Sequence, residues 1–74
     1  MHNTLIVFDA AGRELAREEA KSKAARMSVK GAADQRQLAA LGQRTPGAAS
    51  GRIGTACFVF RNGYPMWTGF ADEA

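Results

Sequence analysis

Apolar side chains cluster near both ends of the chain, and the patterns there predict strands. Residues 3–9, NTLIVFD, form a nearly continuous β-branched and aromatic run that stops at turn residues, as in a strand buried on both faces. Near the other end, bulky residues flank Asn62 and Gly63, the strongest short-range signal for a two-residue type I′ turn. The pattern therefore predicts that strands at about 55–61 and 64–70 pair as a hairpin.

The turn at Asn62 and Gly63 also predicts which residues face each other and which faces they share. Counting outward from the turn predicts the pairs Arg61 with Tyr64, Phe60 with Pro65, Val59 with Met66, Phe58 with Trp67, and Cys57 with Thr68. One face then carries Ala56, Phe58, Phe60, Pro65, Trp67 and Gly69, and a helix would cover it. The other carries Cys57, Val59, Arg61, Tyr64, Met66, Thr68 and Phe70, and we expect it to stay partly open.

Pro65 predicts the place of the last strand in the sheet. In this register its nitrogen points away from the hairpin partner, where a further strand would find no donor. The last strand is therefore expected at an edge, and the N-terminal strand is expected to pair on the other side of residues 55–61.

The middle of the chain is rich in helix formers. Residues 13–27 place Ala16, Ala20, Ala24 and Met27 at helical spacing, which predicts a helix. The alternative is a hairpin over residues 8–17, with Gly12 in the left-handed position of its turn and the helix delayed to Glu18; the sequence leaves both open. A second, shorter helix is predicted from Ala32 or Ala33 to Leu41, ended by Gly42 with Pro46 beyond it.

These elements predict one small α+β domain spanning residues 1–74. It has a three-stranded sheet, made of the N-terminal strand and the C-terminal β-hairpin, with one or two helices packed on one face. Residues 44–54, rich in Gly, Ala and Ser, are predicted to be a flexible loop.

The cysteine and histidine content limits which cross-links could stabilise so short a chain, and the apolar pattern indicates its cellular compartment. Cys57 is the only cysteine and His2 the only histidine, so neither an internal disulfide nor an ordinary structural zinc site is expected. No secretory signal or membrane-spanning apolar run is seen. We expect a cytoplasmic protein with a reduced thiol, without metal or cofactor and without a membrane partner.

The residue types that carry catalysis do not form a recognisable set. His2 is expected to be a terminal residue without a role, Cys57 an inert buried thiol, and Asp9 a turn or helix-cap residue. Residues 47–54 superficially suggest a phosphate-binding loop, but they lack the Gly-Lys-Ser/Thr ending and a following helix. The sequence thus favours a protein that is not an enzyme.

Charge is distributed unevenly along the chain. The net charge is +3, yet residues 20–61 hold eight Lys and Arg against a single acid, Asp34. We expect this basic segment and the open sheet face to contact a partner. The predicted contact residues are Lys23, Arg26, Lys30, Arg36, Arg44, Arg52, Arg61, Tyr64 and Met66.

The functional hypothesis is a small binding protein that modulates or inhibits a protein or nucleoprotein complex. Abundant Ala, Gly and Arg suggest a bacterial or phage origin, and the size suits phage-encoded inhibitors of host defence such as anti-CRISPR proteins, although no motif identifies a family. Two alternatives stay open. One is nucleic-acid binding by the basic region 21–61, and the other is a homo-oligomeric regulatory subunit, for example a homodimer.

Overall fold

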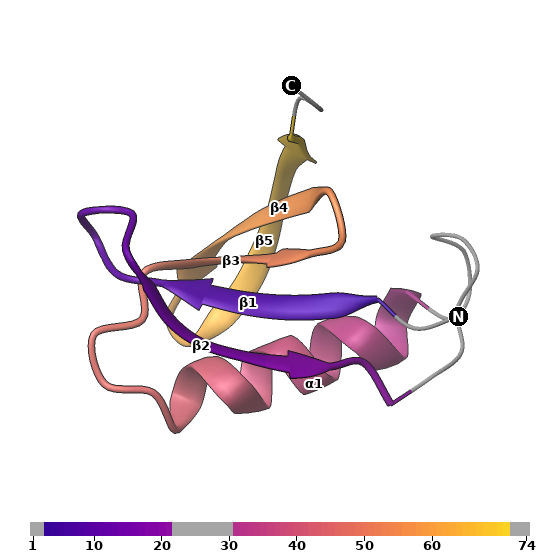
Figure 1. Ribbon diagram of the computed structural model, residues 1–74, viewed down its shortest axis with the longest axis horizontal. Helices are drawn as coiled ribbons and strands as arrows, with labels where there is room; N and C mark the ends of the chain where they lie inside the picture. Colours follow the sequence, from indigo (N-terminus) through magenta and orange to yellow (C-terminus); the bar gives the residue numbers. More distant parts are fainter. Residues whose placement is uncertain (1–2, 22–30, 72–74) are drawn as a thin grey trace.

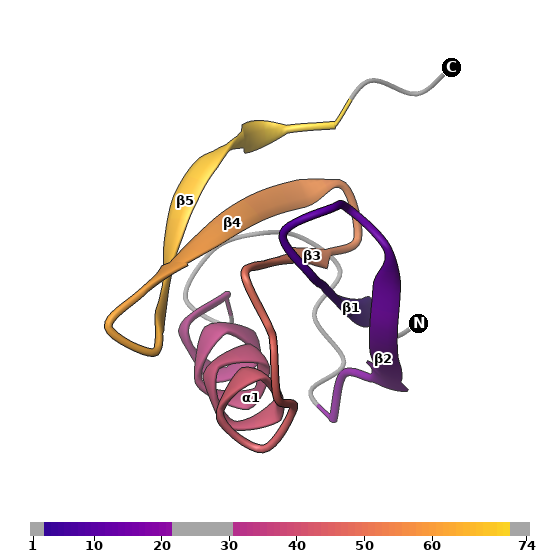
Figure 2. The ribbon, with the colours of Figure 1, turned by 90° about the vertical axis from the view of Figure 1, so that its left-hand side faces the viewer.

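The computed structural model describes residues 3–21 and 31–71, which form a five-stranded antiparallel sheet and one helix (Figure 1). The elements in chain order are β1 (Thr4–Phe8), β2 (Glu14–Glu19), α1 (Gly31–Gln43), β3 (Ser50–Ile53), β4 (Ala56–Arg61) and β5 (Tyr64–Phe70). The spatial order is β2-β1-β3-β4-β5, so β2 and β5 are the two edges. The sheet curves around α1, which lies on its concave side (Figure 2).

The predicted three-stranded sheet with one or two helices is wrong, although the protein is still α+β. The predicted sheet lacked two strands: β2 lies within residues 13–27, for which a helix was expected and a hairpin kept as the alternative, and β3 lies within the segment 44–54 that was expected to be a loop. As a result β1 pairs with β2 and β3, and it does not reach β4 directly.

The turn after β1 explains why β2 is a strand. The Asp9 carboxylate accepts hydrogen bonds from the backbone nitrogens of Ala11 (2.9 Å) and Arg13 (2.8 Å), and Gly12 has a φ of 84°. Such a locally satisfied turn reverses the chain and lets Glu14–Glu19 pair with β1, which outweighs the helix propensity of these residues. The alternative hairpin over residues 8–17 is therefore the correct one, but its helix from Glu18 is wrong, because β2 continues to Glu19; Asp9 is a turn residue. Residues 22–30, with Ala24 and Met27, lie outside the described residues.

Small residues in β3 serve close packing. Gly51 is buried between β1 and α1: a Cβ there would lie 3.0 Å from the backbone oxygen of Ile6 and 3.1 Å from Cδ1 of Leu38. The glycine that suggested a loop is thus what lets the helix approach the middle of the sheet. The missing side chain also explains the weak strand signal of this segment.

The C-terminal hairpin forms as predicted around Asn62 (φ 52°) and Gly63 (φ 79°). The four predicted pairs from Arg61–Tyr64 to Phe58–Trp67 are confirmed, and so is the edge position of β5. The fifth pair is wrong, because a β-bulge places Gly69, not Thr68, opposite Cys57.

The bulge changes the face on which the end of β5 presents its side chains. Phe70 pairs with Ala56, whose side chain is in the core, so Phe70 comes to the same face as Trp67 and not to the opposite one. The two rings meet edge to face with centroids 5.5 Å apart.

Helix α1 supplies the other half of the core. It runs to Gln43, two residues past the predicted end, because Gly42 lies inside the helix against the ring of Phe60. Thr45 then ends it, donating from Oγ1 to the Leu41 oxygen over 2.6 Å. The buried cluster between helix and sheet contains Leu5, Val7, Ala20, Leu38, Leu41, Ile53, Ala56 and Phe58. Within the described residues, no helix has the length and apolarity to cross a bilayer.

Candidate interaction surface

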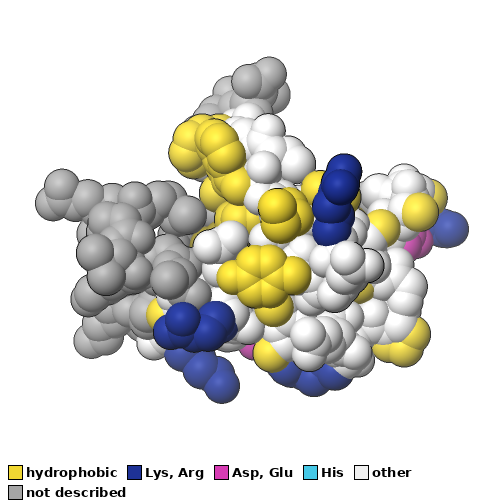
Figure 3. Space-filling model, turned by 180° about the vertical axis from the view of Figure 1, so that it is seen from behind, with side chains coloured by type: hydrophobic (Ala, Val, Ile, Leu, Met, Phe, Trp, Pro, Cys, Tyr) yellow, Lys and Arg dark blue, Asp and Glu magenta, His cyan; other side chains and the backbone are white. Residues whose placement is uncertain are grey.

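Large exposed apolar side chains concentrate on one hairpin. Of the six in the part of the chain that the structure describes, five belong to β4 and β5, and the sixth is Leu15 of β2. We call these five the hairpin surface: Val59 (37% exposed), Tyr64 (48%), Met66 (48%), Trp67 (57%) and Phe70 (62%). When the molecule is seen from the side opposite to that of Figure 1, hydrophobic side chains gather on its surface (Figure 3).

The hairpin surface has two sides. Trp67 faces the concave side, because it pairs with the buried Phe58, and Phe70 joins it there through the bulge. The sequence had predicted that a helix covers Trp67. Instead, the C-terminal end of β5 extends away from α1, which leaves both rings exposed (Figure 1).

The convex side of the sheet carries the remainder of the hairpin surface. Val59 and Met66 pair directly across β4 and β5, and Tyr64 lies beside Arg61 at the turn. No element among the described residues packs on this side, since α1 lies on the other. The expectation that this face stays partly open is thus confirmed within the described ranges.

The backbone of β5 restricts how a partner could bind. Pro65 has no N–H to offer at the edge, and its carbonyl oxygen accepts from Nε2 of Gln35 on α1 over 3.5 Å. The bulge between the pairs of Cys57 and Phe58 interrupts the strand further along. Proline and bulges are devices that hinder strand addition at an edge, so contacts here would be made mainly by side chains.

Charge on the convex side differs between its two halves. On the β2 half, Arg17 donates two hydrogen bonds of 2.8 and 2.7 Å to Glu14, and this bonding lowers the pKa of the Glu14 carboxyl. The β3 to β5 half holds Arg52 and Arg61, and residues 35–71 contain no Asp or Glu at all. This half therefore combines apolar side chains with positive charge that no acid among the described residues pairs with.

Arg52 occupies the middle of that half. It lies between Ile6 of β1 and Cys57 of β4 in the register, and its guanidinium carbon is 5.9 Å from the centroid of the Phe8 ring. Its Nε atom is buried and has no hydrogen-bond partner within the described structure. A buried donor without a partner costs free energy and is rare in folded proteins, so Arg52 is a candidate functional residue.

The predicted contact residues do not form one surface. Lys23, Arg26 and Lys30 lie outside the described residues. Arg36 projects from α1 and Arg44 directly follows that helix, both on the other side of the sheet, and Arg44 is bonded to Glu18 over 2.8 Å. The structure brings together the remaining four on the convex side, namely Arg52, Arg61, Tyr64 and Met66.

Two exposed aromatic residues were missing from the predicted contact set. Trp67 was assigned to a covered face and Phe70 to the wrong face. The one sequence signal that bears on Phe70 is Gly69, since an isolated glycine in a strand often marks a bulge.

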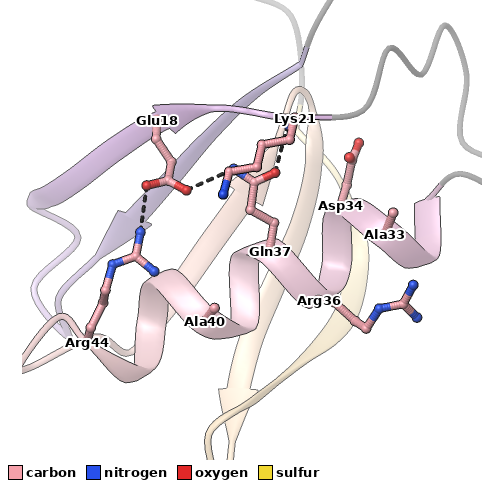
Figure 4. Close-up of a pocket in the computed structure, with 8 residues that line it drawn as sticks. All are labelled: Glu18, Lys21, Ala33, Asp34, Arg36, Gln37, Ala40 and Arg44. Carbon is pink, nitrogen blue, oxygen red and sulfur yellow. Dashed lines mark hydrogen bonds and ion pairs between the residues drawn. The ribbon is translucent and has the colours of Figure 1, made fainter.

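A shallow pocket of about 510 Å³ lies between α1 and β2 (Figure 4). Three of its polar side chains are linked through Glu18, which accepts from Gln37 and Arg44, each over 2.8 Å, and Gln37 also accepts from the backbone nitrogen of Lys21. Arg36 points away from this network in Figure 4. The bonds fasten the helix to the edge strand β2, so we assign the pocket a structural role.

The described residues group no three His, Cys, Asp or Glu side chains that could hold a metal ion. Comparison with protein-family models, curated proteins and solved structures finds no match to this chain.

Proposed function

We propose that this protein is a non-enzymatic binding protein that docks onto a protein partner through the hairpin surface. The observation that carries the proposal is the concentration of five exposed apolar side chains on one hairpin. A 74-residue chain gains only about 3–5 kcal/mol from its core, so leaving Trp67 and Phe70 outside works against its own stability. Burying such residues against a partner recovers that contribution.

The residue types suit a protein interface. Tyr, Trp, Phe and Met are enriched where proteins meet, and aromatic residues often supply most of the binding energy. Nucleic-acid binding is the weaker alternative, because the predicted basic contact residues are divided between two sides of the sheet: Arg36 and Arg44 lie on the helix side, and Arg52 and Arg61 lie on the convex side.

Docking of this kind needs no catalytic residues. We propose that the protein modulates or inhibits its partner by covering part of the partner's surface. Inhibition of a nucleoprotein complex, in the manner of anti-CRISPR proteins, is the specific case that the size and basic charge of the chain favour.

A photocrosslinking comparison tests the proposal. The crosslinkable amino acid p-benzoylphenylalanine replaces Tyr64 in one version of the full chain and Leu15 in another, each expressed in the organism that carries the gene. Leu15 is the matched control because it is also apolar and 40% exposed, but it lies on β2. We expect one protein to be crosslinked in stoichiometric amount from position 64 and not from position 15.

Three results would contradict the proposal. Crosslinking to the same proteins from both positions would mean nonspecific contact, and the absence of any crosslinked protein from position 64 would remove the docking surface. Crosslinking only to a second copy of the chain would identify a self-association surface instead.

A further inference from the structure

We propose, resting on the proposed function, that the partner segment on the convex side is acidic as well as apolar, and that one of its carboxylates binds Arg52. The site lies over β1, β3 and β4, next to Val59 and Met66 of the hairpin surface. The ligand class is thus a protein segment carrying Asp or Glu beside aliphatic or aromatic residues.

The position of Arg52 supports the carboxylate. Its guanidinium is held near the Phe8 ring, an arrangement that orients the charged group without neutralising it. Nε is buried inside the protein, so an approaching carboxylate would bind the terminal nitrogens of the guanidinium, which are not buried. Arginine presents its donors as a planar fork that matches a carboxylate, so such a bond is strong and directional.

The surroundings of Arg52 favour a partner of opposite charge. The other arginine of this half, Arg61, is exposed at the hairpin end and has no ion pair in the described structure, and residues 35–71 supply no acid to either arginine. Arg17, on the β2 half, is already bonded to Glu14. An incoming acidic surface would therefore meet two cations that have no ion pair with any described residue.

Charge and apolarity together decide against the other occupants. In a two-fold dimer through this face the same surface would meet itself, which would bring the arginines of the two copies toward each other. A nucleic acid would supply phosphates for the arginines, but its backbone would also lie against the apolar side chains of Val59 and Met66. An acidic, apolar protein segment complements both features.

Peptide selection tests the inference with the full chain. Random dodecapeptides displayed on phage are selected against the immobilised wild-type protein, and the enriched peptides are synthesised and their Kd values measured by fluorescence anisotropy. We expect the enriched peptides to carry Asp or Glu beside apolar residues. Arg52→Met should weaken their binding on the order of 10- to 100-fold, the loss of one charged hydrogen-bonded contact.

Matched variants separate the contributions. Arg36→Met makes the same chemical change on α1 and should leave Kd unchanged, whereas Arg61→Met should weaken binding less than Arg52→Met does. Arg52→Lys keeps the charge but loses Nε and the planar fork, so its Kd should fall between wild type and Arg52→Met. If Arg52→Met does not give the dispersed amide spectrum of a folded protein, Arg52→Lys and Arg61→Met provide the test.

Enrichment of neutral or basic peptides, no enrichment, or a wild-type Kd for the Arg52 variants would overturn the inference. Binding of a duplex or single-stranded oligonucleotide in place of the peptides would also overturn it. Met66→Glu distinguishes the two proposals. If it abolishes peptide binding while the Arg52 variants do not, only the acidic partner is refuted; if it leaves binding intact, the hairpin surface is refuted as well.

Discussion

The contact between Gly42 and Phe60 gives a prediction whose sign depends on the fold. Gly42 is helical, and replacing a helical glycine by alanine ordinarily stabilises a protein by about 1 kcal/mol. Here a Cβ at position 42 would lie 2.6 Å from Cζ and 2.8 Å from Cε1 of Phe60, closer than van der Waals contact allows. Phe60 is itself packed against the core, so its ring cannot move without disturbing other contacts.

Overpacking of this kind costs roughly 1–3 kcal/mol, against the gain of about 1 kcal/mol in helix propensity. We therefore expect Gly42→Ala to lower the free energy of unfolding of the wild-type protein by up to about 2 kcal/mol. In a Phe60→Leu background the clash is gone, and the same substitution should raise the free energy of unfolding by up to about 1 kcal/mol. The coupling between the two positions is then about 1–3 kcal/mol.

Urea unfolding of the four proteins of this double-mutant cycle, followed by circular dichroism, measures both effects. Ala40→Gly is the control, because Ala40 is exposed on the same helix and reports the propensity difference alone. If Gly42→Ala stabilises the wild-type and Phe60→Leu proteins equally, the helix does not pack against β4 as described.

Three further predictions concern the core, a surface ion pair and the exposed tryptophan. Leu38 is fully buried, so Leu38→Ala should cost about 2–5 kcal/mol, comparable to the whole stability of so small a domain, and the variant should be largely unfolded by circular dichroism. Hydrogen bonding to Arg17 lowers the pKa of Glu14 in the folded state, so the pair stabilises the protein above the ordinary carboxyl range and its contribution is lost as pH falls through that lowered pKa. The difference in urea midpoint between wild type and Glu14→Gln should therefore be present at neutral pH and vanish in acid; a difference that persists or grows in acid would be inconsistent with this. Trp67, the only tryptophan, is 57% exposed, so its fluorescence should resemble that of free tryptophan amide and be readily quenched by acrylamide, and a blue-shifted, protected emission would count against its placement.

The parts of the fold that were predicted correctly depend on local chemistry. The Asn62 and Gly63 turn needs positive φ at both positions, which few other residues adopt, so the turn and the four nearest pairs followed from the sequence. Pro65 likewise indicated an edge strand, because the lack of an N–H is a property of the residue itself. The helix near residues 32–41 was likewise predicted from local features, namely its helix-forming residues and their spacing.

The missed strands depend on tertiary context. Glu14–Glu19 consists of good helix formers, and the Asp9 turn together with pairing to β1 overrides that preference. Ser50–Ile53 is a strand because β1 and β4 lie on either side of it, and glycine fits at position 51 because Leu38 and the Ile6 carbonyl leave no room for a Cβ. The nearly continuous apolar run of β1 indicates burial on both faces, but it does not say which segments pair with the strand.

Prediction of the surface failed where small geometric details decide exposure. The single extra residue at the bulge turns Phe70 to the other face of the sheet, and the extension of β5 away from α1 leaves Trp67 uncovered. Basic residues of the same sequence segment, 20–61, also lie far apart on the fold. Arg44 bonds Glu18 on the helix side, whereas Arg61 lies at the hairpin end.

The affinity of the crosslinked partner for two charge-inserting variants tests the central claim most directly. Met66→Glu and Leu15→Glu each place a carboxylate at a similarly exposed apolar position, 48% and 40%, on opposite edges of the sheet. We predict that both variants fold and that only Met66→Glu loses the partner. Equal affinity of the two variants would contradict the assignment of the hairpin as the docking surface.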